Sequence, residues 1–291
     1  MSTVELPSGH AMPKVGYGTF KVQQDECAQL VRTALEYGVR HIDTAAVYGN
    51  EAGVGDAVRR FENETQERVF VVSKVSPRSM RSTVEKCLEG ATKSLEKLAL
   101  QRPLNLLLLH WPGRSGVPHN SPKNKASRLA SWRALCKLKR EGHVIDIGVS
   151  NFEPQHLEEL YELAQEDDEV FIPAVNQVEM HPLFQQRELR LYCRQKHLCL
   201  VAYSPLACAS DDLLKNPHVL EIARAVQRTP AQVVLRWALQ HDVCVIPKSR
   251  TPSRIQENAQ IEDFELSKEQ MTQLDSLDCG SKMCWDPSTI L

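Results

Sequence analysis

Polar side chains recur at the C-terminal ends of apolar segments along this chain of 291 residues. Each segment is typical of a strand buried on both faces, since leucine and β-branched residues fill it without polar alternation. If these strands run parallel in one closed sheet, their polar ends meet at a single mouth. The residues at these ends are Asp43, Lys74, His110, Ser150, Asn151, Gln177, Glu179, Tyr203, Ser204, Lys248 and Ser249.

Asp43, Tyr48, Lys74 and His110 form a candidate acid–base set. A buried lysine beside a tyrosine is expected to lower the pKa of the phenol from about 10, and an aspartate beside the lysine keeps it charged. Taken singly, Asp43 fits a helix cap, Lys74 a solvated cation and His110 a hydrogen-bonded structural histidine. Together they predict general acid–base catalysis.

The elements that would position these residues alternate between strand and helix. Eight strands in unbroken alternation at this length predict an α/β fold, a (β/α)8 TIM barrel, as one domain over residues 1–291. We also expect an N-terminal β-hairpin with Ser8 and Gly9 at its turn, and an extra C-terminal helix over 267–276. The longest loop, 113–125, follows a strand and belongs on the catalytic face. The expected strands are 14–18, 39–43, 69–74, 104–110, 144–150, 174–179, 198–203 and 243–247, and the expected helices include 25–37, 79–97, 127–140, 154–166, 186–196 and 252–260.

Composition excludes several classes of protein. Hydrophobic residues make up 42% and charged residues 25%, which is ordinary globular usage. A net charge of −2 argues against a nucleic-acid-binding protein. The longest apolar run, 104–109, is far too short to span a membrane, and the first ten residues carry no secretory signal. We therefore expect a cytoplasmic monomer that binds neither nucleic acid nor membrane.

The cysteines predict neither disulfides nor a metal site. Nine is an odd count and no CxxC pair occurs, which favours reduced thiols. Cys279 and Cys284, taken with Cys193, Cys199 and His197, are spaced unlike structural zinc ligands. We expect no metal.

Gly16, Gly18 and Asp43 imitate a dinucleotide-binding fingerprint of the Rossmann type. Lys21 stands where the third glycine should be, and Asp43 lies within a strand of its own. We reject that interpretation.

Several motifs resemble those of the aldo-keto reductases, and they occur in that family's order. Asp43-Thr-Ala-Ala-Val-Tyr48 matches the family's Asp-Thr-Ala-x-x-Tyr motif, and the resemblance extends from residue 12 to about 277. The sequence is similar to the single-chain barrel reductases of the aldose reductase and prostaglandin F synthase type. The other matching segments are 72–74, 109–112, 148–152, 175–179, 203–206 and 246–249.

This resemblance implies reduction of aldehydes and ketones with NADPH, which becomes NADP+. Tyr48 would then be the general acid, tuned by Lys74 and Asp43, and His110 would orient and polarise the carbonyl oxygen. The implied substrate-binding residues are Phe20, Tyr48, His110 and Trp111.

The resemblance also implies a cofactor site. Lys248, Ser249 and Arg254 would bind the adenosine 2′-phosphate, with Arg250 as a further cation, and Glu257 and Asn258 would contact the adenine. Ser150, Asn151 and Gln177 would bind the carboxamide, and Tyr203 would stack on the nicotinamide. The full set is Gly18, Thr19, Phe20, Ser150, Asn151, Gln177, Tyr203, Ser204, Leu206, Lys248, Ser249, Arg250, Thr251, Arg254, Glu257 and Asn258.

The chain also departs from the family pattern. Ser76 stands where many members carry a tryptophan, and the segment 205–217 and the tail after Leu277 are short. We therefore expect a more open and polar pocket and weaker cofactor binding. The alternative to an enzyme is a catalytically weak NADPH-binding or sensing module, since related barrels serve such roles. The intact set of Asp43, Tyr48, Lys74 and His110 favours the enzyme.

Overall fold

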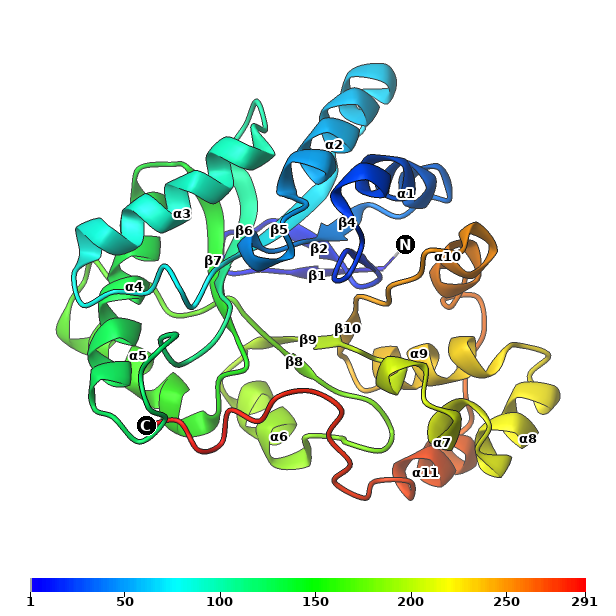
Figure 1. Ribbon diagram of the computed structural model, residues 1–291. Coiled ribbons are helices and arrows are strands. Elements are labelled where there is room, and N and C mark those ends of the chain that lie inside the picture. The colour runs from blue at the N-terminus through cyan, green and yellow to red at the C-terminus, as the bar shows by residue number, and fades with distance from the viewer. Residues whose placement is uncertain (1) are drawn as a thin grey trace.

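The computed structural model describes residues 2–291 and begins with the expected antiparallel hairpin (Figure 1). Strands β1 (Thr3–Glu5) and β2 (Ala11–Pro13) pair through a turn in which Gly9 has a φ of 81°, a conformation that favours glycine. Leu6 and Met12 pack with apolar side chains of the barrel interior. The hairpin therefore covers one end of the barrel.

Eight parallel strands follow in sequence order, each hydrogen-bonded to the next. The sheet also joins its own edges, because Val15 forms a parallel bridge with Val245 and the Gly16 N–H donates to the Val245 carbonyl at 2.8 Å. The predicted (β/α)8 barrel is thus confirmed. Its strands are β3 (Tyr17–Gly18), β4 (His41–Asp43), β5 (Phe70–Val75), β6 (Leu104–Leu109), β7 (Val144–Ser150), β8 (Val175–Glu179), β9 (Cys199–Tyr203) and β10 (Cys244–Val245).

The helices pack around the outside of the strands (Figure 1). Among the described residues, no helix is long and apolar enough to cross a membrane. The helices are α1 (Gln24–Glu36), α2 (Glu51–Thr65), α3 (Val84–Leu98), α4 (Lys123–Arg140), α5 (Pro154–Glu166), α6 (Arg187–Gln195), α7 (Asp211–Leu214), α8 (Pro217–Ala225), α9 (Pro230–Gln240), α10 (Pro252–Ala259) and α11 (Lys268–Asp275), with short 3-10 turns η1 (Ala46–Tyr48) and η2 (Ala207–Ala209).

Several helices differ from the expected ones. Helices α2, α7, α8 and α9 were not among those named, and in α2 two internal glycines weaken the helical pattern. Gly55 is required there, because a Cβ at this position would overlap the Leu98 carbonyl where α2 meets α3. Helix α3 begins five residues later than expected, and α4 begins at Lys123, inside the expected loop 113–125.

Candidate active site

Lys74 connects the candidate acid–base residues at the mouth of the barrel. Its Nζ donates to Asp43 Oδ1 at 2.6 Å and to the Tyr48 hydroxyl oxygen at 3.3 Å. The side chains of Lys74 and Asp43 are 0% and 2% exposed, so their ion pair is shielded from water. The other carboxylate oxygen of Asp43 accepts a hydrogen bond from Gln177 Nε2 at 2.8 Å. Tyr48, Lys74, Asp43 and Gln177, from four separate segments, therefore form one continuous series of hydrogen bonds.

The position of Tyr48 depends on Asn50, a residue that the sequence analysis did not single out. Asn50 is fully buried, and its Nδ2 donates to the carbonyl oxygens of Thr19 and Val22, each at 2.9 Å. Its Oδ1 accepts from Thr44 Oγ1 at 2.8 Å. Asn50 thus ties the segment between β4 and α2, which carries Tyr48, to the end of β3. Its place directly before α2 was the available signal, since asparagine is common at helix starts.

His110 lies at the end of β6, beside Tyr48. The two ring centroids are 5.7 Å apart in an edge-on arrangement, and Asn151 Nδ2 donates to the His110 carbonyl at 3.1 Å. Burial, and then the Lys74 ammonium, lowers the pKa of His110 to about 3. His110 Nδ1 is buried without a hydrogen-bond partner. A neutral imidazole therefore faces the mouth as a donor without a fixed charge.

The expected lowering of the Tyr48 pKa by Lys74 is wrong. Burial raises the pKa of Tyr48 well above 10, and the nearby Asp43 carboxylate adds to that shift. Burial also lowers the pKa of Lys74, while Asp43 opposes that change. The phenol consequently stays protonated, which is the state that a proton donor needs.

A second chain of hydrogen bonds joins the ends of β7, β8 and β9. The Tyr203 hydroxyl donates to Asn151 Oδ1 at 2.7 Å, and Asn151 Nδ2 donates to Ser150 Oγ at 3.1 Å. Ser150 Oγ donates to the Gln177 carbonyl at 2.8 Å. Asn151 has a φ of 64°, a left-handed conformation that asparagine tolerates. The predicted residues Ser150, Asn151, Gln177 and Tyr203 are therefore brought together.

The basic segment after β10 leads into α10. Lys248 is exposed, and partial desolvation of its ammonium, followed by the Arg250 and Lys21 cations, lowers its pKa. Lys248 and Arg254 form no ion pair with any described residue, whereas Arg250 pairs with Glu26 at 2.7 Å. Lys248 and Arg254 are thus free to receive an anion, and Arg250 already has a partner.

The remaining expected cofactor residues lie at the ends of β3 and β9 and in or next to α10. Thr19 is buried and donates to the Asp43 carbonyl at 3.0 Å, and Glu257 accepts from the Thr229 hydroxyl at 2.6 Å. Thr251 is the first residue before α10, and Ser249 Oγ accepts from its N–H at 3.1 Å. The others are Gly18 at the end of β3, Ser204 and partly buried Leu206 after β9, and buried Asn258 in α10.

Phe20 and Trp111, the expected substrate-binding residues, lie beside Tyr48 and His110 respectively. The Phe20 ring is 45% exposed and lies 5.1 Å from the Tyr48 ring, centroid to centroid, and Trp111 follows His110 and is partly exposed. Ser76 is buried, and its Oγ accepts from the Arg78 N–H at 3.1 Å. The Ser76 hydroxyl therefore supports a turn after β5.

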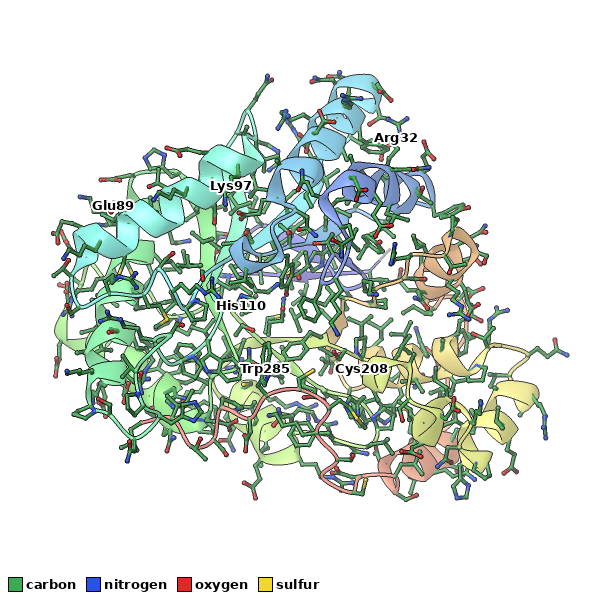
Figure 2. All side chains as sticks on the ribbon, in the orientation of Figure 1. Arg32, Glu89, Lys97, His110, Cys208 and Trp285 are labelled. Carbon is green, nitrogen blue, oxygen red and sulfur yellow. The ribbon has the colours of Figure 1, made fainter. Side chains whose placement is uncertain are left out.

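The C-terminal tail runs across the same end of the barrel, which the sequence pattern did not indicate. The N–H groups of Met283 and Cys284 donate to the Glu179 carboxylate at 2.6 and 3.0 Å. Figure 2 shows His110, Trp285 and Cys208 on the face along which the tail passes. Among the described residues, no group of three or more His, Cys, Asp or Glu side chains is arranged to hold a metal ion.

Comparisons with known proteins agree over nearly the whole chain. A family model described as "Aldo/keto reductase family" matches residues 14–278. A 9,11-endoperoxide prostaglandin H2 reductase from Trypanosoma cruzi (strain CL Brener) is 43% identical over 287 residues, covering 98% of this chain and 94% of that protein. A glyoxal reductase from Bacillus subtilis (strain 168) is 42% identical over 290 residues, covering 99% and 97%. The crystal structure of MGS-M4, an aldo-keto reductase enzyme from a Medee basin deep-sea metagenome library, is 36% identical, with a TM-score of 0.86 over 98% of each chain.

Proposed function

Because this chain belongs to the aldo/keto reductase family, we propose that it is an NADPH-dependent reductase of aldehydes and ketones in which Tyr48 is the general acid. One observation carries the proposal: the Tyr48 hydroxyl, the Lys74 ammonium and the Asp43 carboxylate form a chain of contacts of 3.3 and 2.6 Å at one mouth. A phenol that keeps its proton beside a buried ammonium suits proton donation to a developing alkoxide.

The residues around the mouth fit a nicotinamide dinucleotide. Ser150, Asn151 and Gln177 present side-chain polar groups that suit a carboxamide, and Tyr203 presents an aromatic ring beside them. Lys248 and Arg254, with the start of α10 between them, suit a phosphate. This pair of cations without partners among the described residues is the reason that we favour NADPH over NADH.

When bound, the nicotinamide would supply a hydride to the carbonyl carbon. Tyr48 then donates its hydroxyl proton to the carbonyl oxygen, which becomes the alcohol. Lys74 stabilises the resulting phenolate from 3.3 Å, and Asp43 holds the ammonium in place. Neutral His110 donates a hydrogen bond to the same oxygen and polarises it before the proton moves.

Small α-oxoaldehydes are the first substrates to test, because a relative with 42% identity is named glyoxal reductase. The experiment is an assay of glyoxal, an aromatic aldehyde, a ketone and a quinone with NADPH and with NADH. We expect turnover with NADPH on at least one carbonyl compound. A protein that binds NADPH and reduces none of them would instead be a binding or sensing module.

A further inference from the structure

Glu179 holds the C-terminal tail above the mouth. Its carboxylate accepts from the N–H groups of Met283 and Cys284 and from His181 Nε2 at 3.1 Å. Although burial alone would raise the pKa of Glu179, these hydrogen bonds lower it below its ordinary value. An ionised Glu179 therefore fixes the backbone at Cys284, and with it the place of the Cys284 thiol.

Two thiols from distant segments meet at one hydroxyl group. Cys284 Sγ lies 3.6 Å from Ser204 Oγ, and the Cys208 thiol contacts the same oxygen at 3.8 Å. Cys208 belongs to the loop after β9 and Cys284 to the tail, so 76 positions of the chain separate them (284 minus 208). Figure 2 shows Cys208 on the exposed face beside the tail.

The surroundings give the two thiols different reactivity. Cys208 is exposed, and the Lys248 ammonium is a neighbouring cation. Cys284 is partly buried, and burial first, with Glu179 and Cys208 among the further causes, raises its pKa to about 11. The exposed thiol is therefore suited to react first and the covered thiol to react second.

The loop that carries Cys208 is under backbone strain. Ala207, Cys208 and Ala209 have φ angles of 49°, 56° and 61°, three successive left-handed residues without a glycine. Residues with a Cβ disfavour this conformation. The segment therefore has more relaxed conformations to adopt when Cys208 moves toward the tail.

We propose that Cys208 and Cys284 form a reversible disulfide when the protein meets a hydroperoxide, and that this bridge hinders binding of the cofactor beside Tyr203 and Ser204. The Cys208 thiolate attacks the peroxide, the O–O bond breaks, and a sulfenic acid and one water result after uptake of a proton. The Cys284 sulfur then attacks the Cys208 sulfur, and its proton leaves with the displaced hydroxide as a second water. Two thiols are oxidised and one hydrogen peroxide is reduced.

The expected consequence rests on the proposed cofactor site. Ser204 and Tyr203 directly precede this loop and belong to the residues that we assign to the cofactor. A covalent bond from the loop to the tail would pass directly beside Ser204, which Cys208 and Cys284 both contact. NADPH would then enter poorly until a reductant such as dithiothreitol opens the bridge.

The test is peptide mapping by mass spectrometry and NADPH titration by protein fluorescence, before and after treatment with hydrogen peroxide. The variants are C208S and C284S, and C279S serves as the matched control because Cys279 is another exposed thiol of the tail. We expect a peptide linked through Cys208 and Cys284 in the wild type and C279S. In both, NADPH affinity should fall at least about tenfold and return with dithiothreitol, an ordinary coupling between sites. C208S and C284S should form no such peptide and keep their affinity.

Several outcomes would overturn the proposal. These are the absence of the linked peptide, an equal loss of affinity in C208S and C284S, or a bridge between Cys199 and Cys244 instead. The sulfurs of that second pair are 4.0 Å apart on neighbouring strands, but Cys244 is buried. A bridged protein with unchanged NADPH affinity would reject the effect on cofactor binding. Formation of the bridge in a protein that binds NADPH in neither state would contradict the proposed function while supporting the bridge.

Discussion

The Tyr48 hydroxyl keeps its proton because burial, with the Asp43 carboxylate adding to it, raises the pKa of the phenol. Sequence spacing indicates that Lys74 is near Tyr48, but it carries no information on how deeply the phenol lies or how closely Asp43 neutralises the lysine. The neighbours were therefore predictable and the direction of the pKa shift was not. The same burial keeps His110 neutral, which suits a hydrogen-bond donor to a carbonyl oxygen.

Lys248 and Arg254 should determine the choice between NADPH and NADH. The double variant K248M/R254M should weaken NADPH by about two to four powers of ten, from about 1.5–3 kcal/mol for each lost charged contact. NADH binding should change much less, as measured by fluorescence titration. R250M is the matched control, since Arg250 is already paired with Glu26. Equal weakening of both cofactors in the double variant would show that the 2′-phosphate binds elsewhere.

The strands were predictable because each is an apolar run, and most of these runs end at a polar residue. Helix α2 was harder, because glycines at 53 and 55 interrupt the pattern and the need for them lies in the packing against α3. Asn50 and the tail were missed for a similar reason. Their partners are carbonyl groups and a carboxylate that only the folded chain brings near.

Asn50 should stabilise both the fold and the position of Tyr48. Replacing it by alanine leaves the Thr19 and Val22 carbonyls and the Thr44 hydroxyl without their partner. We expect N50A to lower the free energy of unfolding by about 2–4 kcal/mol, measured by urea denaturation, and to reduce turnover. N63A, at an exposed asparagine of α2, is the control. If N50A unfolds at the same urea concentration as N63A, the role given to Asn50 is wrong.

The barrel closes over a short stretch, since β3 and β10 are two residues long and the parallel bridge that joins the edges pairs Val245 with Val15, a residue before β3. The C-terminal tail is also hydrogen-bonded across the catalytic end of the barrel, through the Glu179 carboxylate. Burial lowers the pKa of His156 to about 4, and its Nε2 donates to the Ile290 carbonyl at 2.8 Å. His156 thus links the stability of the whole molecule to pH.

Lowering the pH should destabilise the protein through His156. Between pH 6.5 and about 4 the unfolded chain takes up a proton on this histidine and the folded chain does not. The free energy of unfolding therefore falls as pH falls, by up to about 1.4 kcal/mol per unit from this residue. Urea denaturation at several pH values in that range gives the free energy of unfolding as a function of pH. This free energy should change less with pH in H156Q than in H143Q, a variant at an exposed histidine. An identical dependence on pH in the two variants would contradict the prediction.

Proton donation by Tyr48 is tested most directly by comparing turnover and cofactor binding in Y48F. The variant removes only the hydroxyl that contacts Lys74 at 3.3 Å, and Y37F is the control at a tyrosine 38% exposed to solvent. We predict that Y48F loses at least about 100-fold in kcat, the usual contribution of a positioned general acid, while its Kd for NADPH stays at the wild-type value. Wild-type kcat in Y48F with NADPH bound would contradict the account.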